Sequence, residues 1–251
     1  MLRKGDGIAV TARELFDAGR VREAEALLTA HLRDHPSEVE QRTFLFELLC
    51  FSGDYGRAEK QLSVLANGSA EREMGAIVYY AALHAEKTRH EVFQKQQFST
   101  DASTISPMGT LNGRPFRVLR DSDPDLGARL EVFAAGAYLL IPFEHIASLD
   151  MEPPRRLRDT LWRPATVRTG PSFRDAELGE VLVPAIYPFS WRHTDGAVWL
   201  GRVTGWAADE EGKEYPLGQK VWLLDGEEIP FLEIRRLEFS LKQAADRAVT
   251  N

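Results

Sequence analysis

The stretches "LFDAGRVREAEALL" (residues 15–28) and "LCFSGDYGRAEKQL" (residues 49–62) carry one pattern twice. The second follows the first at an offset of 34 residues, with leucine, glycine, alanine and glutamate at equivalent places. A period of 34 residues is typical of tetratricopeptide (TPR) repeats, in which each unit is a pair of antiparallel helices. The sequence therefore predicts stacked helical hairpins in this part of the chain.

The small residues of the two copies fit this prediction. Gly19 and Gly53 fall where antiparallel helices must turn, and glycine adopts the positive φ that such turns need. Ala24 and Ala58 fall where paired helices would cross closely. A third stretch, 71–93, again spaces its apolar residues as a helix does. Because a repeat stack needs about three units to bury a continuous core, we expect this short array to pack against the rest of the chain.

The texture of the sequence changes after the third helical stretch. A polar segment ending at Pro107 predicts a linker, and the turn dipeptides Asn112-Gly113 and Ala135-Gly136 then separate short apolar runs, which indicates β-hairpins. A short helix is expected at 155–162, and a strand at 197–206. We predict an α+β fold in two parts, with a TPR-like helical repeat domain at 1–93, a linker at 94–108, a β-rich α+β domain at 109–241 and a polar tail at 242–251.

Composition narrows the classes of function. The 251 residues carry a formal net charge of −7, which argues against a general nucleic-acid binder. No run approaches the roughly 18 apolar residues of a membrane-spanning helix, and the first residues do not form a secretory signal. Cys50 is the only cysteine, so no disulfide forms within the chain. We expect a cytoplasmic protein that binds neither nucleic acid nor membrane.

The sequence lacks the short motifs of common enzymes: no nucleophile elbow, phosphate-binding loop, dinucleotide glycine motif or metalloprotease helix is present. Asp121, Asp123 and Asp125 mimic the first, third and fifth positions of a calcium loop. Leu126 and Val132 then occupy its sixth and twelfth positions, where glycine and a bidentate glutamate are required. We therefore expect a turn that leads into a helical segment.

Histidines offer two further candidates for chemistry. His31 and His35 are four residues apart and share a helix face, but zinc needs a third ligand, for which Cys50 is the one soft candidate. Solvated histidines near a helix end are the simpler interpretation. His193 stands beside Asp195 and would be a general base if it were buried, whereas Thr-Asp-Gly favours a turn. We predict no catalytic residue, no metal and no cofactor.

Two other features allow more than one interpretation. The basic clusters at 155–159 and 233–239 are interleaved with acids, which indicates either solvated faces or a contact patch for an acidic partner. Four tryptophans gather in the second part, where they serve either core packing or the stacking of a ligand: Trp191, Trp199, Trp206 and Trp222.

Taken together, several motifs resemble the ImpE/TagJ family (SciE-type) of bacterial type VI secretion systems. They are the doubled helical pattern, "NGRPF", "GAYLLIPFEHIASLDMEPPRRLRDTLWRPA", "VLVPAIYP" and "PFLEIRRLEF". The resemblance implies a non-enzymatic accessory protein of the cytoplasm. It further implies binding to the small sheath subunit, TssB, through a helix near the N-terminus of that subunit, and an association with ClpV, the ATPase that recycles the contracted sheath.

The architecture itself predicts where such a partner binds. A TPR-like stack presents a groove lined by the first helix of each pair, and an amphipathic helix can lie in it. By repeat spacing, Arg13 and Phe16 would face this groove from the first pair, with Glu40, Thr43 and Glu47 from the second. Other interpretations remain open. These residues form an ordinary solvated face, in which Arg13 pairs with Glu47, or they are buried against the second domain. The protein is otherwise an enzyme whose β-rich part carries the chemistry and whose helices serve for docking.

Overall fold

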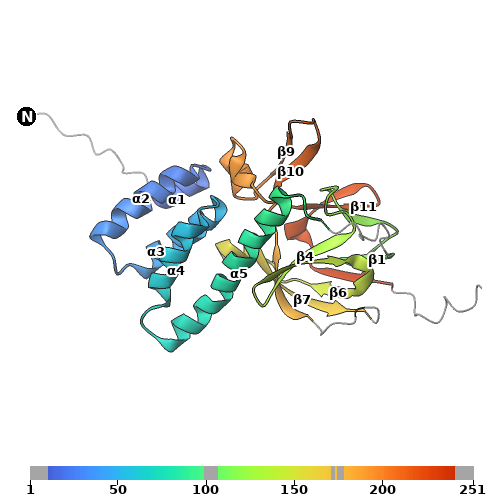
Figure 1. Cartoon of the computed structure of the whole chain (residues 1–251), viewed down its shortest axis with the longest axis horizontal. Helices are drawn as coiled ribbons and strands as arrows, with labels where there is room; N and C mark the ends of the chain where they lie inside the picture. Colours follow the sequence, from blue (N-terminus) through green and yellow to red (C-terminus); the bar gives the residue numbers. More distant parts are fainter. Residues whose placement is uncertain (1–10, 99–106, 171–172, 174–177, 241–251) are drawn as a thin grey trace, which may run out of the picture.

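The computed structural model describes residues 11–98, 107–170, 173 and 178–240. Successive helices form the first part of the described chain (Figure 1). Four of them stack as antiparallel hairpins, and a long fifth helix follows. They are α1 (Ala12–Asp17), α2 (Val21–Asp34), α3 (Val39–Phe51), α4 (Tyr55–Ala66) and α5 (Ala70–Gln94). The predicted helical hairpins and third helix are therefore confirmed.

The repeated small residues do what their spacing predicted. Gly19 and Gly53 each adopt a φ of 74°, at the turn between the helices of a pair. Ala24 and Ala58 are fully buried where those helices contact each other. Helix α4 also begins at a capping residue, since the side chain of Asp54 accepts a hydrogen bond from the backbone N–H of Arg57. Local sequence thus sets the geometry of both hairpins.

The second part of the chain is built of antiparallel strands. An eight-stranded sheet has the order β2-β1-β13-β6-β7-β8-β4-β5, beside a three-stranded sheet β12-β11-β3 and a two-stranded sheet β10-β9. The first strands are β1 (Gly109–Leu111), β2 (Arg114–Phe116), β3 (Leu119–Asp121), β4 (Arg129–Ala134), β5 (Ala137–Pro142), β6 (Ile146–Asp150) and β7 (Trp162–Thr169). The others are β8 (Gly179–Pro184), β9 (Thr204–Ala208), β10 (Glu214–Gly218), β11 (Val221–Leu224), β12 (Glu227–Pro230) and β13 (Arg236–Phe239). The two-part α+β fold is confirmed.

Short helices interrupt the strands. They are α6 (Gly196–Trp199) and the 3-10 helices η1 (Phe143–His145), η2 (Leu157–Thr160), η3 (Ser190–Arg192) and η4 (Phe231–Glu233). The strand expected at 197–206 is therefore only partly correct, because the side chain of Asp195 caps Ala197 N–H and starts a helical turn there. The helical segment expected after Asp125 was wrong: residues 122–128 form turns that lead directly into β4.

Two predicted turns are confirmed by their backbone angles. Asn112 and Gly113 take φ values of 50° and 80° between β1 and β2, and Ala135 and Gly136 take 48° and 84° between β4 and β5. Positive φ at both central residues gives the turn that matches the twist of a β-hairpin. The predicted tail at 242–251 and the middle of the predicted linker, 99–106, lie outside the described residues.

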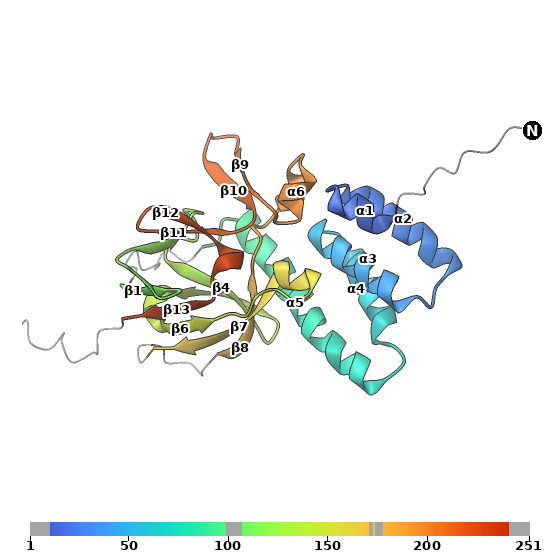
Figure 2. The ribbon, with the colours of Figure 1, turned by 180° about the vertical axis from the view of Figure 1, so that it is seen from behind.

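Helix α5 joins the two parts of the molecule. It lies between the other helices and the large sheet, and it contacts both β4 and β5 (Figures 1 and 2). One apolar cluster runs from the helices into the second part, where it includes Phe133, Trp162 and Ile186, while another fills the space between the strands. The expectation that the short array packs against the rest of the chain is confirmed. Within the described ranges, no helix is long and apolar enough to span a bilayer.

Candidate functional site

A groove of about 880 Å³ opens between the first helices and a distant segment of the chain. Helices α1, α2 and α3 form most of it, and residues 155–158 close one side. Figure 2 shows η2, drawn in yellow, lying beside the helices at this junction. We refer to the following lining residues as the helical groove: Thr11, Ala12, Arg13, Leu27, Leu28, His31, Glu38, Val39, Glu40, Gln41, Thr43, Phe44, Glu47, Arg155, Arg156, Leu157 and Arg158.

The helical groove combines exposed apolar side chains with charges of both signs. Leu27 and Val39 leave 40% and 45% of their surface open to solvent, so apolar surface is available within the groove. Acidic groups come from the start of α3, and Arg155 and Arg156 come from the segment before β7. An apolar strip flanked by unlike charges is suited to an amphipathic helix, since apolar anchors give affinity and charges fix its direction.

Four of the five residues predicted to face a groove do line it: Arg13, Glu40, Thr43 and Glu47. Phe16 does not. Its side chain is only 8% exposed, and its ring meets that of Phe44 edge to face at 5.5 Å. Phe16 therefore belongs to the packing beneath the groove, and only Phe44 of this pair reaches the lining.

The charges within the groove pair differently from the alternative that linked Arg13 to Glu47. Glu47 meets Arg158 at 3.3 Å, and Arg13 instead stacks over the ring of Phe44 at 4.9 Å. Glu47 is 9% exposed, and burial raises the pKa of its carboxyl group although Arg158 and Arg13 lower it. This ion pair joins α3 to the segment before β7, so it holds the two sides of the groove together.

The contribution of residues 155–158 is the part of the groove that repeat spacing missed. The basic cluster "RRLRD" at 155–159 had two open interpretations, and it turns out to supply three arginines to one side of the groove. The carboxylate of Asp159 accepts hydrogen bonds from the backbone N–H groups of Arg155 and Arg156, which fixes the chain at this point. The cluster was visible in the sequence, but its position beside the helices was not.

A buried cluster of charged side chains lies elsewhere, beneath α5. Arg89 donates two hydrogen bonds to Glu131, at 2.7 and 2.9 Å. Lys220 lies 2.5 Å from Glu131 and 2.9 Å from Asp121, and all of these side chains are buried. Burial raises the pKa of Glu131, but Arg89 and Lys220 outweigh it and hold that pKa at about 2. A catalytic site would place such groups beside a cleft.

The hollow beside this buried network holds about 10 Å³, which is room for a single water molecule. His90 lines it, and burial lowers the pKa of its imidazole to about 4. The network therefore forms a polar contact between α5 and the sheet, and the hollow beside it has no space for a substrate. The other candidates for catalysis also have structural partners. Asp125 pairs with Lys213, and Nδ1 of His193 accepts a hydrogen bond from the backbone N–H of Asp195 in a turn.

The tryptophans serve mainly in packing. Trp222 is buried among the strands, and Trp191 stands edge to face against Tyr55 at 5.9 Å, on the boundary with the helices. Trp199 lies under the guanidinium of Arg22 at 5.1 Å. Trp206 is 48% exposed.

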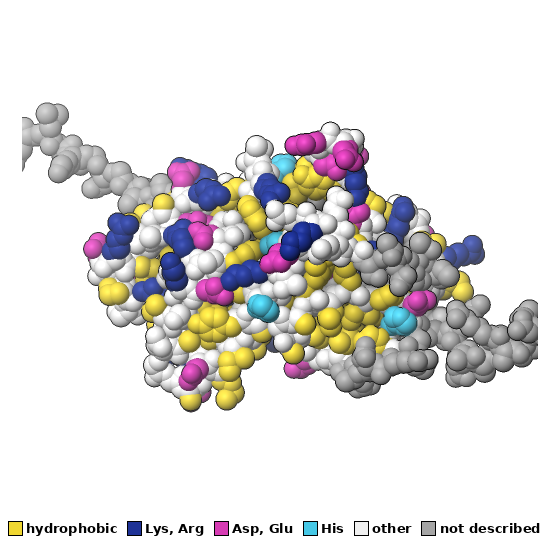
Figure 3. Space-filling model, in the orientation of Figure 1, with side chains coloured by type: hydrophobic (Ala, Val, Ile, Leu, Met, Phe, Trp, Pro, Cys, Tyr) yellow, Lys and Arg dark blue, Asp and Glu magenta, His cyan; other side chains and the backbone are white. Residues whose placement is uncertain are grey.

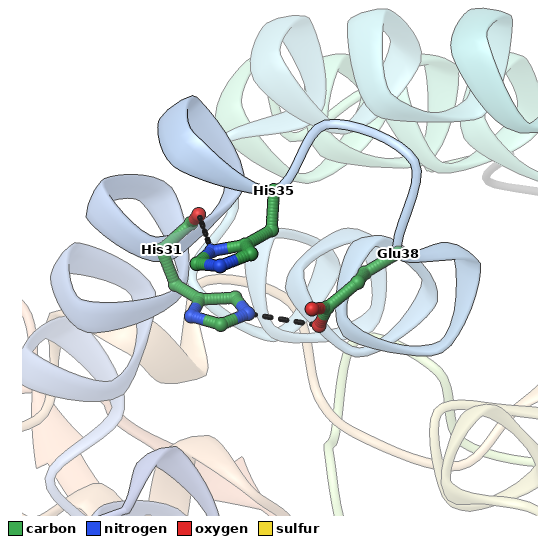
Figure 4. Close-up of side chains that lie close together, drawn as sticks. All are labelled: His31, His35 and Glu38. Carbon is green, nitrogen blue, oxygen red and sulfur yellow. Dashed lines mark hydrogen bonds and ion pairs between the residues drawn. The ribbon is translucent and has the colours of Figure 1, made fainter.

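One cluster in the described part of the chain has donors suited to a metal ion: His31, His35 and Glu38 (Figure 4). The histidines lie near the end of α2, partly or fully exposed as expected, and the turn after α2 brings a carboxylate that the sequence analysis had not considered, Glu38, to 2.8 Å from Nε2 of His31. Cys50 is not involved, because it is buried in the core.

Known proteins share the sequence and the fold of this chain. Residues 113–238 match the model of the family described as "ImpE protein". The chain is 30% identical over 266 aligned residues to the type VI secretion system accessory component TagJ of Pseudomonas aeruginosa, and the alignment covers 92% of each chain. A crystal structure of a protein from Vibrio parahaemolyticus shares the fold with a TM-score of 0.79 at 22% identity, over 93% of this chain and 98% of that one. The chain therefore belongs to the ImpE/TagJ family that its motifs resemble.

Proposed function

We propose that this protein is a non-enzymatic adaptor of a type VI secretion system, and that it holds a helical segment of the small, TssB-like sheath subunit in the helical groove. The relationship to TagJ supports an accessory role in such a system. The observation that carries the groove is its lining, which combines the exposed apolar side chains of Leu27 and Val39 with acidic side chains of α3 and with Arg155 and Arg156.

The dimensions of the groove favour a helix over a small molecule. Its 880 Å³ lie open along three helices, whereas the sites of small ligands enclose most of the surface of the ligand. An amphipathic helix would place apolar side chains at intervals of three and four residues along the strip. Acidic side chains on such a helix would meet Arg155 and Arg156, and basic ones would meet Glu40.

The proposal extends to the place and partners of the protein. The resemblance to the family implies work in the cytoplasm and an association with ClpV, the ATPase that recycles the sheath. The alternative, an enzyme in the β-rich part, draws on the perturbed buried charges. It is disfavoured because those charges satisfy one another around a hollow of about 10 Å³.

Isothermal titration tests the proposal. The full chain is titrated with a synthetic peptide of the N-terminal segment of the small sheath subunit from the same organism. We expect one-to-one binding, and we expect Val39→Glu to weaken it at least tenfold by placing a charge in the apolar strip. Val64→Glu is the matched control, since Val64 is 48% exposed on α4 and lies outside the groove.

Each outcome decides a different part of the proposal. Equal affinities for the two variants would move the binding site away from the groove while keeping the adaptor. No binding, either to the peptide or to the full subunit, would refute the adaptor itself. Phe16→Ala and Glu47→Lys are poor probes, because both side chains are buried and their loss would disturb the fold.

A further inference from the structure

The end of helix α2 and the turn after it bring together two imidazoles and a carboxylate. Nε2 of His31 lies 2.8 Å from Oε2 of Glu38, and the rings of His31 and His35 stack with their centroids 4.4 Å apart. One ligand atom from each of the three side chains lies within 4.8 Å of the other two (Figure 4). We propose that His31, His35 and Glu38 form a site for a divalent transition-metal ion of the zinc class.

The donor set suits this class of ion. Two imidazole nitrogens with one carboxylate oxygen form a common zinc-binding set, and water completes the coordination. A tetrahedral zinc ion with bonds of about 2.0 to 2.1 Å separates its ligand atoms by about 3.4 Å. The pair His31–Glu38 must therefore open slightly and His35 must approach. An imidazole binds a metal ion in the plane of its ring, so the stacked rings must also turn apart until both lone pairs point at one ion. The three side chains are partly or fully exposed, so rotations about their own bonds can make this adjustment.

The hydrogen bonds leave the correct nitrogen of His35 available. Its Nδ1 lies 3.2 Å from the carbonyl oxygen of His31, and a carbonyl only accepts, so Nδ1 carries the proton. The lone pair of the neutral ring is then on Nε2. A backbone carbonyl that accepts from the second ring nitrogen is the usual companion of a metal-binding histidine, because it fixes which nitrogen carries the proton.

Without a metal ion, a hydrogen bond joins Nε2 of His31 to Oε2 of Glu38. In the proposed site, the metal ion replaces the proton between these two atoms. The imidazole of His31 keeps one proton by carrying it on Nδ1 instead, so the ring stays neutral when Nε2 binds. The carboxylate supplies one negative charge to the cation, and the carbonyl end of the α2 dipole adds to the attraction.

The turn that carries the third ligand is held in place. Arg42 of α3 donates a hydrogen bond to the carbonyl oxygen of Pro36 at 2.8 Å, which fixes the chain between His35 and Glu38. The same guanidinium also donates to Gln61 at 2.7 Å, so Arg42 ties this turn to α4. His31 and Glu38 also line the helical groove, so the ion would lie at its edge. The site does not depend on whether a peptide binds in that groove.

Titration of the tag-free, metal-stripped full chain with zinc chloride, followed by calorimetry, tests the site. We expect one zinc ion per chain. His35→Ala should lower the zinc affinity more than about tenfold, because removing a residue that only supports a ligand already lowers metal affinity by about tenfold or more. Glu38→Gln should lower it as well, because the amide has no charge to offer the cation. His84→Ala is the matched control, since His84 is exposed on α5 and outside the cluster.

Circular dichroism of each variant verifies that the helices are intact, which is expected for substitutions at these exposed positions. Absence of zinc binding to the native chain would overturn the proposal. Binding that survives both His35→Ala and Glu38→Gln would also overturn it, because the ion would then be held elsewhere.

Discussion

The buried charges beneath α5 give the most quantitative prediction. Glu131 is fully buried and accepts hydrogen bonds from Arg89, Lys220 and the hydroxyl of Tyr138. Glu131→Gln keeps the shape of the side chain but removes its charge, so two buried cations lose their shared partner. Breaking a buried ion pair from one side costs about 3–5 kcal/mol. We expect a loss of this size in the free energy of unfolding at neutral pH.

The same pair predicts how this loss depends on pH. The pKa of Glu131 is about 2 in the folded chain, against an ordinary value of 4.5. A difference of about 2.5 pH units corresponds to about 3 kcal/mol. Because the folded pKa is lowered, this stabilisation is fully present above pH 4.5 and is lost as the pH falls toward 2. The variant lacks the titrating group, so the difference between the two proteins must shrink in acid.

Urea denaturation followed by tryptophan fluorescence measures both quantities, at pH 7 and at pH 3. Glu238→Gln is the control, because Glu238 pairs with Arg236 on the surface and its removal should leave the midpoint unchanged. A loss below about 1 kcal/mol for Glu131→Gln at pH 7 would refute the reasoning, because it falls short of the cost of a broken buried pair. An equal loss at both pH values would contradict the assigned pKa.

Three further predictions follow from single residues. Gly53→Ala should destabilise the fold by about 2 kcal/mol or more, since the φ of Gly53 is 74° and the new Cβ would press into the ring of Trp191. Gly56→Ala, in open space on α4, should instead stabilise the fold by about 0.5–1 kcal/mol, and urea midpoints test both variants. Burial and Asp121 raise the pKa of Asp123 to about 7, so its ionised form destabilises the fold, and the stability advantage of Asp123→Asn should grow from pH 4 to 7 and then level off. Burial raises the pKa of the Cys50 thiol well above its ordinary value, so a disulfide reagent should modify it quickly in urea and slowly in the native protein.

The features that the sequence revealed are those fixed by neighbouring residues. The turns at Gly19 and Gly53 depend on backbone angles that glycine adopts locally, and the long α5 depends on its own helical period. The first half of the strand expected at 197–206 was wrong for a local reason that the sequence also contained, the cap at Asp195. The boundaries proposed between the two domains and the linker remain predictions.

Features that depend on distant segments were beyond such reasoning. Repeat spacing assigned Phe16 to the groove, but Phe44 and Arg202 cover it, and Arg202 comes from far along the chain. The basic side of the groove could not be placed either, because its position depends on how residues 155–158 fold against α3. Glu38 escaped notice as a metal ligand since a turn, and not helical spacing, brings it to His31.

The repeated glycines show why the helices and the sheets act as one unit. A Cβ at Gly53 would meet the ring of Trp191. Gly196 lies so close to Gly19 that a Cβ on Gly196 would strike the carbonyl oxygen of Gly19. Each repeat thus presents its turn to the β-rich part. The residues matched by the family model, 113–238, supply the basic side of the groove, and the helices outside that match supply the apolar strip and the acidic side. A partner that needs both sides can bind only the assembled chain, so separating the helices from the sheets should abolish binding even if the helices stay folded.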